Sequence, residues 1–417
     1  MSIFTKLNQK RKEKKNNQTE DITVDKKHLI LRIILFVVFL GGGITGIVIG
    51  CTYNSTHVDK GWTLIESSDG ENSASNFVLN YYFSSENKRE NAKESKELTN
   101  AYTTYCNDAY IMFNPYKHFN GVNGVFFINA HPNTDVKVET PFYNTLKKVK
   151  DNNSDVLFLG PIYDSYYNLF NAKNDDEAKE ADPYFNNDIK QYYGEVKSYI
   201  NNGDISLELK EDNVVRLNIS DAYLNYCSEN KITNYFSFNY FYNAASIDYI
   251  ADKLIANGFK NFKLYSYEGY FRIHFADSTL STTYVPRTFY NNLIVPEANV
   301  TFNTSITLVE FKTFPIAELE DYYLYDDKTF AHHFVNDEGL YTSCTSSLYL
   351  YQKGDTSALD ILLKGKEVFI QPTIDVVKLK EIGYFIFNED NVIKYNDDKL
   401  EIKPTENNDF VFTKELI

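Results

Sequence analysis

An apolar run at residues 29–50, LILRIILFVVFLGGGITGIVIG, constrains this chain of 417 residues more than any other feature. The run carries no charge after Arg32. At a rise of about 1.5 Å per residue, a helix of this length measures about 33 Å, which is enough to cross the hydrocarbon core of a bilayer. The run therefore predicts a transmembrane helix near the N-terminus.

The charges on the two sides of the run predict its orientation. Residues 1–28 hold eight lysines and arginines against four acidic residues, whereas the whole chain has a formal net charge of −15. Basic flanks stay on the cytoplasmic side of a membrane, so we expect the N-terminus inside. The predicted organisation is a basic cytoplasmic tail (1–28), a transmembrane anchor (29–50), a polar stalk (51–75) and an extracytoplasmic domain (76–417). The protein would then be a single-pass protein of the cell membrane.

Two other interpretations of the apolar run stay open. Residues 48–51, VIGC, resemble the lipobox of a bacterial lipoprotein, in which Cys51 would be lipidated after cleavage. The run is longer than the usual signal-peptide core of about 7–15 residues, which favours an uncleaved anchor. A buried core helix is the other alternative, and the basic flank argues against it.

The composition and the missing motifs narrow the function. An acidic chain argues against nucleic acid as a partner, because binding it needs a basic face. The four cysteines form no CxxC pair and no zinc-spaced cluster with histidine. We expect Cys106, Cys227 and Cys344 to be buried and inert, with one disulfide among them as the alternative. The sequence also lacks GxGxxG, GxxxxGKS/T, HExxH and GxSxG motifs. It therefore gives no support to the common nucleotide-binding, zinc-protease or serine-hydrolase functions.

The hydrophobic patterns mix helices and strands without a regular βαβ order, which predicts an α+β fold. The clearest helix covers 244–257, where apolar residues recur at helical spacing and Gly258 ends the helix. Further helices are expected at 141–149, 155–170, 182–201 and 357–363. Strands are expected at 76–83, 205–209, 214–219, 235–240, 263–267, 270–275, 306–311, 322–325 and 348–352, followed by a hairpin within 384–395.

Several short segments, taken in order, resemble one family. They are GPIY at 160–163 with YYNLF at 166–170, IDYIADKL at 247–254 with NGFKN at 257–261, EG at 268–269, DY at 321–322 with HHFVN at 332–336, and ALD at 358–360. Together they are similar to the ApbE-like FAD:protein FMN transferases over residues 76–417. The resemblance implies a T-fold-related mixed sheet, FAD and Mg²⁺ as cofactors, and transfer of FMN from FAD to a Thr or Ser of an acceptor protein.

The resemblance also implies a set of site residues. The implied catalytic residues are His333 and Asn336, the cofactor-binding residues are Asp248, Glu268, Gly269 and Tyr341, and the metal ligands are Asp360 and the backbone carbonyl of Ala251. Four of these residues have a structural alternative, and for His333 it is a purely structural role. Asp248 could serve the dipole of its own helix, Asn336 could be a turn residue, and Asp360 could pair with Lys364.

Departures from the family pattern define a second functional hypothesis. The family's glycine-rich LDLGGIAKG segment is FSFNYFYNA here, at 236–244, with Asn239 and Tyr240 where glycines would let backbone approach a phosphate. Lys364 stands where the family has a Ser or Thr that donates an oxygen to Mg²⁺, and an ammonium group cannot coordinate a cation. The alternative is therefore a catalytically degenerate surface protein that acts as a binding or scaffold module.

Overall fold

The computed structural model describes residues 57–67, 76–152, 155–290, 293–314, 321–341, 347–371, 373–388, 392–405 and 410–414. The expected tail and anchor, together with Cys51 and Cys344, lie outside these residues. Among the helices that are described, none combines the length and apolar character needed to cross a bilayer. The residues from Asp59 to Ile417 pack together as one unit.

A nine-stranded sheet organises this unit, with the strand order β1-β2-β6-β7-β12-β15-β16-β17-β19. Neighbouring strands are antiparallel except for β17 and β19, which run parallel. The strands are β1 (Gly61–Ile65), β2 (Phe77–Phe83), β6 (Asn261–Ser266), β7 (Tyr270–Phe275), β12 (Ile306–Phe311), β15 (Ser347–Lys353), β16 (Gly383–Asn388), β17 (Val392–Tyr395) and β19 (Val411–Lys414).

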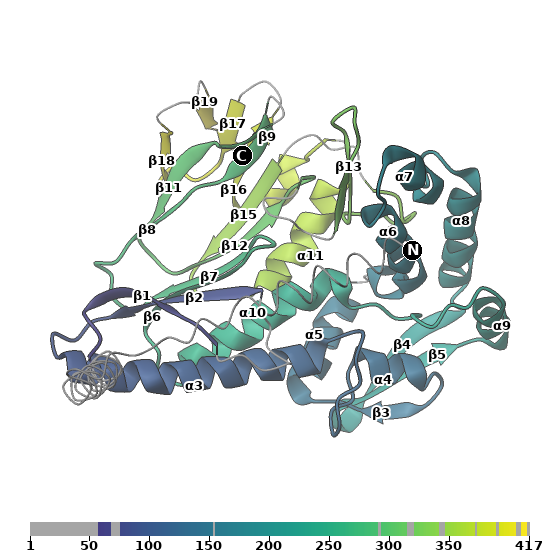
Figure 1. Cartoon of the computed structure of the whole chain (residues 1–417), viewed down its shortest axis with the longest axis horizontal. Coiled ribbons are helices and arrows are strands. Elements are labelled where there is room, and N and C mark those ends of the chain that lie inside the picture. Colours follow the sequence, from purple (N-terminus) through teal and green to yellow (C-terminus); the bar gives the residue numbers. More distant parts are fainter. Residues whose placement is uncertain are drawn as a thin grey trace, which may run out of the picture. The chain divides into compact units, whose positions relative to one another are not determined.

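Helices cover one face of this sheet (Figure 1). Helices α10 (Asn239–Ala256) and α11 (Ala358–Phe369) lie directly on the central strands, and the long helix α3 (Lys88–Phe113) packs on α10. Gly365 lets α11 approach closely, because a side-chain carbon there would collide with the ring of Phe311.

A small second sheet covers the opposite face. Its order is β18 (Glu401–Pro404), β11 (Ala298–Phe302) and β8 (Thr282–Tyr284). Apolar residues of β8 and β11 form one buried cluster with residues of β7, β12, β15 and β16. The central strand β12 is therefore buried along its whole length, whereas β2 alternates between buried and half-buried positions.

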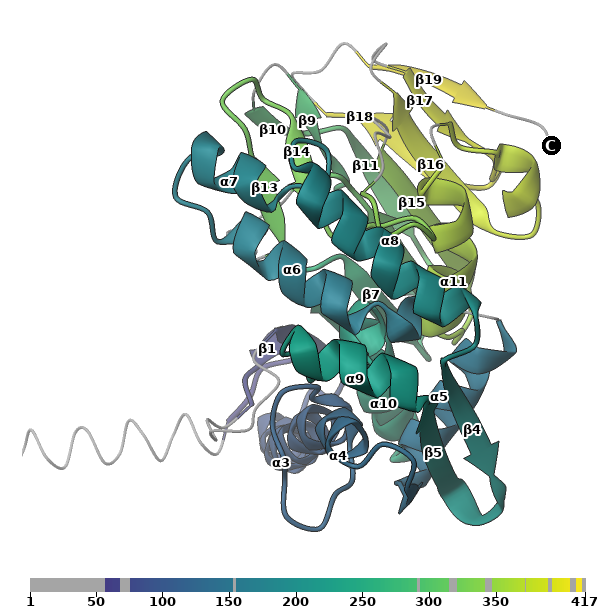
Figure 2. The ribbon, with the colours of Figure 1, turned by 90° about the vertical axis from the view of Figure 1, so that its right-hand side faces the viewer.

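The remaining elements form a lobe beside the sheet (Figure 2). Its helices are α4 (Val125–Ala130), α5 (Thr140–Asp151), α6 (Gly160–Phe170), α7 (Asp175–Ala181), α8 (Asn187–Asn201) and α9 (Asp221–Glu229), with the short 3₁₀ turns η1 (Asp155–Phe158) and η2 (Glu211–Asn213). Three strands pair within it in the order β3 (Asp135–Lys137), β5 (Val214–Ile219) and β4 (Ile205–Lys210). Two hairpins and a third 3₁₀ turn complete the described chain: β9 (Arg287–Tyr290) with β10 (Leu293–Pro296), β13 (Tyr322–Leu324) with β14 (Phe330–His332), and η3 (Val376–Leu379).

The α+β fold class is confirmed, and two local expectations need correction. Residues 61–65, within the expected stalk, form the edge strand β1 and pair with β2. Residues 235–240, expected as a strand, are irregular up to Phe238 and then helical. The reason is Asn129, whose side-chain amide donates to the carbonyl of Phe236 (2.7 Å) and accepts from its N–H (2.8 Å). One asparagine thereby satisfies the backbone groups that a neighbouring strand would have bonded.

Candidate functional site

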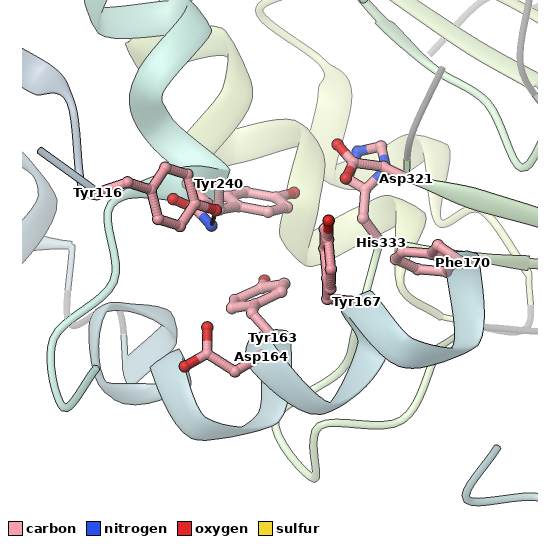
Figure 3. A pocket seen from close by; sticks show the side chains of 9 residues that line it. Tyr116, Tyr163, Asp164, Tyr167, Phe170, Tyr240, Asp321 and His333 are labelled. Carbon is pink, nitrogen blue, oxygen red and sulfur yellow. Dashed lines mark hydrogen bonds between the residues drawn. The ribbon is translucent and has the colours of Figure 1, made fainter. Parts of the chain in front are cut away.

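A cavity of about 500 Å³ lies between α6, the N-terminus of α10 and the β13–β14 hairpin (Figure 3). This volume lies within the range of about 300–1,000 Å³ typical of small-molecule sites. Its lining is dominated by aromatic rings. The lining residues are Tyr116, Tyr163, Asp164, Tyr167, Phe170, Asn239, Tyr240, Asp321 and His333.

Helix α6 supplies one wall. Tyr163, Tyr167 and Phe170 recur at helical spacing and so lie on one face, while Tyr166 is fully buried beside that face and stacks on the ring of Phe170. The helix begins with Pro161, which suits a first turn, and Gly160 packs against the backbone carbonyl of Asn234. A side chain at position 160 would collide with Asn234, so this glycine allows the start of α6 to lie close to Asn234.

The start of α10 supplies the opposite wall. Asn239 and Tyr240 occupy the first turn, and the Asn239 amide donates to the hydroxyl of Tyr116. Figure 3 shows Tyr116 and Tyr240 across the cavity from Tyr163 and Tyr167. Asn239 and Tyr240 are the residues that stand where the family resemblance has glycines, and both side chains line the cavity.

The β13–β14 hairpin brings Asp321 and His333 to the far end of the cavity. His332 is buried, with its Nδ1 accepting from the N–H of Phe334, whereas His333 lines the cavity. Only one histidine of the pair therefore reaches the site, as expected for consecutive residues of extended chain. Burial lowers the pKa of His333 below its ordinary value, and the carboxylate of Asp321 partly offsets this effect. The imidazole is therefore neutral at neutral pH.

Polar atoms of the lining lack partners. Within the described residues, no hydrogen-bond partner is found for the hydroxyls of Tyr163 and Tyr240, for Asn239 Oδ1 or for His333 Nδ1. Buried polar groups are nearly always hydrogen-bonded, and leaving one unpaired costs about 1–3 kcal/mol. The residues that carry these four atoms all line the same aromatic cavity, while the atoms themselves are covered by neighbouring protein.

Asp248 lies elsewhere and has a structural role. Its carboxylate accepts from Ser357 Oγ (2.7 Å) and from the N–H groups of Ala358 (2.8 Å) and Leu359 (3.0 Å), at the start of α11. It also pairs with the buried guanidinium of Arg272 at 2.6 Å. Its oxygens are therefore used within the protein, and the implied flavin contact stays a prediction.

The implied metal site does not fit Mg²⁺ in this structure. Asp360 is held by Lys148 of α5, whose ammonium lies 3.0 Å from each carboxylate oxygen and 3.2 Å from Ser357 Oγ. Ala251 is fully buried in the middle of α10. The cation beside Asp360 is thus Lys148, while Lys364 lies exposed on α11. Among the described side chains, no group of three His, Cys, Asp or Glu residues is placed to hold a metal.

The other implied residues support the frame around the cavity. Asn336 is a turn residue, since its Oδ1 accepts from the N–H groups of Glu338 (2.9 Å) and Leu340 (3.0 Å). Tyr341 donates to the buried carboxylate of Asp182 at 2.8 Å. Glu268 accepts from the Asn243 amide, in the tight turn between β6 and β7. Gly269 in that turn has φ +95°, and its carbonyl accepts from the N–H of Glu310 (2.8 Å).

Of the eight residues implied by the resemblance, only His333 lines the cavity. Tyr163, Tyr167 and Phe170 belong to the segments at 160–163 and 166–170. Their spacing along a helix could have predicted that the three rings share one face. Tyr116 carries no such signal, because only the folded chain brings the loop after α3 opposite α6. Asp164 lies on α6 but outside the helical spacing of those three rings.

Comparisons with known proteins agree with this architecture. No protein-family model matches the chain, and no curated protein sequence matches it. The flavin transferase ApbE from Vibrio cholerae matches as a structure with a TM-score of 0.51 and 10% sequence identity, over 84% of this chain and 97% of that chain. A variant of that protein matches with a TM-score of 0.48 and 10% identity, over 84% and 98% of the two chains. The apo form of the flavinyl transferase ApbE from Pseudomonas stutzeri gives 0.45 and 9%, over 84% and 97%.

The Vibrio cholerae structure therefore confirms the expected fold. This chain is an α+β protein with the fold of the ApbE flavin transferases. At 10% identity the similarity concerns the fold alone.

Proposed function

We propose that the protein is a flavin-binding module, which holds the isoalloxazine ring of a flavin in the tyrosine-lined cavity. The observation that carries the proposal is a cavity of about 500 Å³ whose lining combines aromatic rings with a few polar side chains. An isoalloxazine ring is flat, so it can stack on tyrosine and phenylalanine, and its edge carries hydrogen-bond donors and acceptors that suit the polar side chains of the lining. The ApbE-like fold is consistent with this ligand.

Flavin binding is expected to depend on Tyr167. This side chain lies on the cavity wall and is 63% exposed, so its removal should leave the fold intact. Loss of one stacking ring typically costs about 1–3 kcal/mol, so Tyr167→Ala should weaken riboflavin binding by tenfold or more. The measurement is quenching of flavin fluorescence by the purified full chain in detergent.

A matched control is Tyr267→Ala. Tyr267 is 57% exposed in the β6–β7 turn and does not line the cavity. The Tyr267→Ala variant should bind riboflavin with the same affinity as the wild type. Equal losses in the two variants, or a wild-type protein that binds no flavin, would contradict the proposal.

The ion pair between Asp360 and Lys148 favours a binding or scaffold module over a transferase. Mg²⁺ at this carboxylate would have to displace the Lys148 ammonium and would then face its positive charge. Two of the residues implied for chemistry and flavin contact, Asn336 and Asp248, already have all the partners their structural roles require. The protein would bind a flavin without transferring FMN.

FMN transfer from FAD to a Thr or Ser of an acceptor protein is the second candidate. One observation favours it, namely the neutral His333 next to Asp321 in the cavity. A histidine of this kind can accept the proton of a hydroxyl group. We expect no transfer above background when wild-type protein is incubated with FAD, Mg²⁺ and a Thr-containing peptide.

The transferase function would be supported if the wild type transferred FMN and the His333→Ala variant did so at a rate about 10²–10⁴-fold lower. This is the usual loss on removing a general base. Asp360→Ala should then also abolish transfer, while Asp252→Ala should not.

We further propose that residues 29–50 anchor the protein in the cell membrane, with the basic tail inside and the cavity domain outside. The apolar run and its basic flank support this proposal. Protease added to intact cells should digest the region from residue 57 onward and spare residues 1–28. A mature chain that begins at lipidated Cys51 would instead support the lipobox alternative.

A further inference from the structure

We propose that the tyrosine-lined cavity selects flat aromatic ligands that carry no phosphate, either neutral or positively charged. The proposal rests on the proposed flavin site and names the class of flavin that it takes. It follows from the charges of the lining, which favour a ligand different from the FAD implied by the family resemblance.

The charged side chains of the lining are all acidic. Asp164 and Asp321 are the two ionisable groups that carry charge, and no lysine or arginine is among the described residues that line the cavity. His333 adds no positive charge at neutral pH, since burial lowers its pKa. A phosphate brought into this space would face two carboxylates and find no cationic partner.

Within the part of the chain that the structure describes, the N-terminus of α10 contributes positive potential at the cavity, and part of it is already used. The N–H of Asn239 donates to Ser237 Oγ (3.4 Å), and the N–H of Phe241 donates to the carbonyl of Phe238 (3.0 Å). A helix terminus corresponds to about half a positive charge. Two full negative charges therefore outweigh it.

Aromatic rings and carboxylates together make a site for neutral rings and cations. The faces of tyrosine and phenylalanine carry negative quadrupole potential, which attracts cations and tolerates stacked neutral rings. A flavin phosphate carries about −1.5 to −2 charges at pH 7, as other phosphate monoesters do. Riboflavin has the same ring without this charge, so it is the natural probe.

The test compares four ligands on the full chain in detergent at pH 7.5 and low salt. They are riboflavin, FMN, FAD and proflavin, a flat three-ring cation of similar size. Riboflavin should bind at least tenfold more tightly than FMN or FAD, and proflavin at least as tightly as riboflavin. Raising the salt to 0.5 M should narrow the gap between riboflavin and FMN, because salt screens charges at an open site.

Two double variants, each of which removes two negative charges, test whether the preference for riboflavin over FMN arises in the cavity. Asp164→Asn combined with Asp321→Asn should bring FMN to within about threefold of riboflavin. The amide at position 164 can still accept the hydrogen bond that Asn234 now donates to Asp164. Asp176→Asn combined with Asp188→Asn, which neutralises two acids outside the lining, should leave the ratio unchanged.

The outcomes separate this inference from the proposed function. FMN or FAD binding as tightly as riboflavin would overturn the inference and leave flavin binding intact. A ratio that is unaffected by the Asp164 and Asp321 substitutions would also overturn it. Binding of proflavin without any flavin would retain the charge selectivity and refute the flavin function, and binding of none of the four ligands would refute both.

Discussion

Replacing Asp248 with alanine is expected to lower the free energy of unfolding by about 3–5 kcal/mol, the usual loss when a buried ion pair loses one partner. Asp248 joins three elements. It lies on α10, caps the first N–H groups of α11, and neutralises Arg272 of β7, whose side chain is only 3% exposed. The measurement is the urea unfolding midpoint of wild-type and variant protein, with the slope of the transition compared between them.

Asp252→Ala is the matched control. Asp252 also pairs with Arg272, at 2.8 Å, but its side chain is 68% exposed. Exposed ion pairs contribute about 0–1 kcal/mol, so this variant should lose little stability. If Asp248→Ala were as stable as the wild type but no longer bound flavin, the Asp248 carboxylate would instead be part of the flavin site.

Asp248 also shows what the sequence could and could not predict. The helical spacing of the apolar residues around it correctly predicted a buried helix, and Gly258 ends that helix in the left-handed conformation with φ +84°. The partners of Asp248 could not be predicted, since Arg272 and Ser357 are distant in sequence. The alternative of serving its own helix dipole was wrong, because α10 begins at Asn239 and the carboxylate serves the N-terminus of a different helix.

The same distinction applies to the cavity. The comparison with the family drew attention to the segments at 160–163, 236–244 and 332–336, and residues of all three line one cavity. The chemistry of that cavity depends on which side chains face inward. That depends in turn on local contacts such as the Asn129 bonds to Phe236, which turn an expected strand into the irregular entry to α10. Hydrophobic periodicity does not predict hydrogen bonds between one side chain and a backbone segment that is distant in sequence.

We expect Glu297 to make the folded protein less stable as the pH rises. It is completely buried just before β11, and burial raises its pKa to about 8. The hydrogen bonds agree with a protonated carboxyl group. Tyr349 Oη lies next to both the carbonyl of Arg287 and Glu297 Oε1 (3.1 Å), yet it has one proton to donate. Both contacts are satisfied when Tyr349 donates to Arg287 and the Glu297 carboxyl group donates to Tyr349.

The sign of the pH effect follows from this pKa. The unfolded chain releases the Glu297 proton near pH 4.5, whereas the folded protein keeps it up to about pH 8. The folded state therefore binds the extra proton between these values, and its stability falls as the pH rises through that window. At about 1.4 kcal/mol per pH unit, the loss between pH 5.5 and pH 8.5 should amount to roughly 3 kcal/mol.

Glu297→Gln isolates this contribution, because a glutamine amide can donate to Tyr349 as the protonated acid does but cannot ionise. We expect the free energies of unfolding of wild type and variant to be similar at pH 5.5, and the wild type to become the less stable protein by pH 8.5. Glu229→Gln, at an exposed position of α9, should follow the wild-type profile. Parallel profiles for wild type and Glu297→Gln would mean that Glu297 is ionised in the folded protein, with the nearby Lys312 supplying the compensating charge.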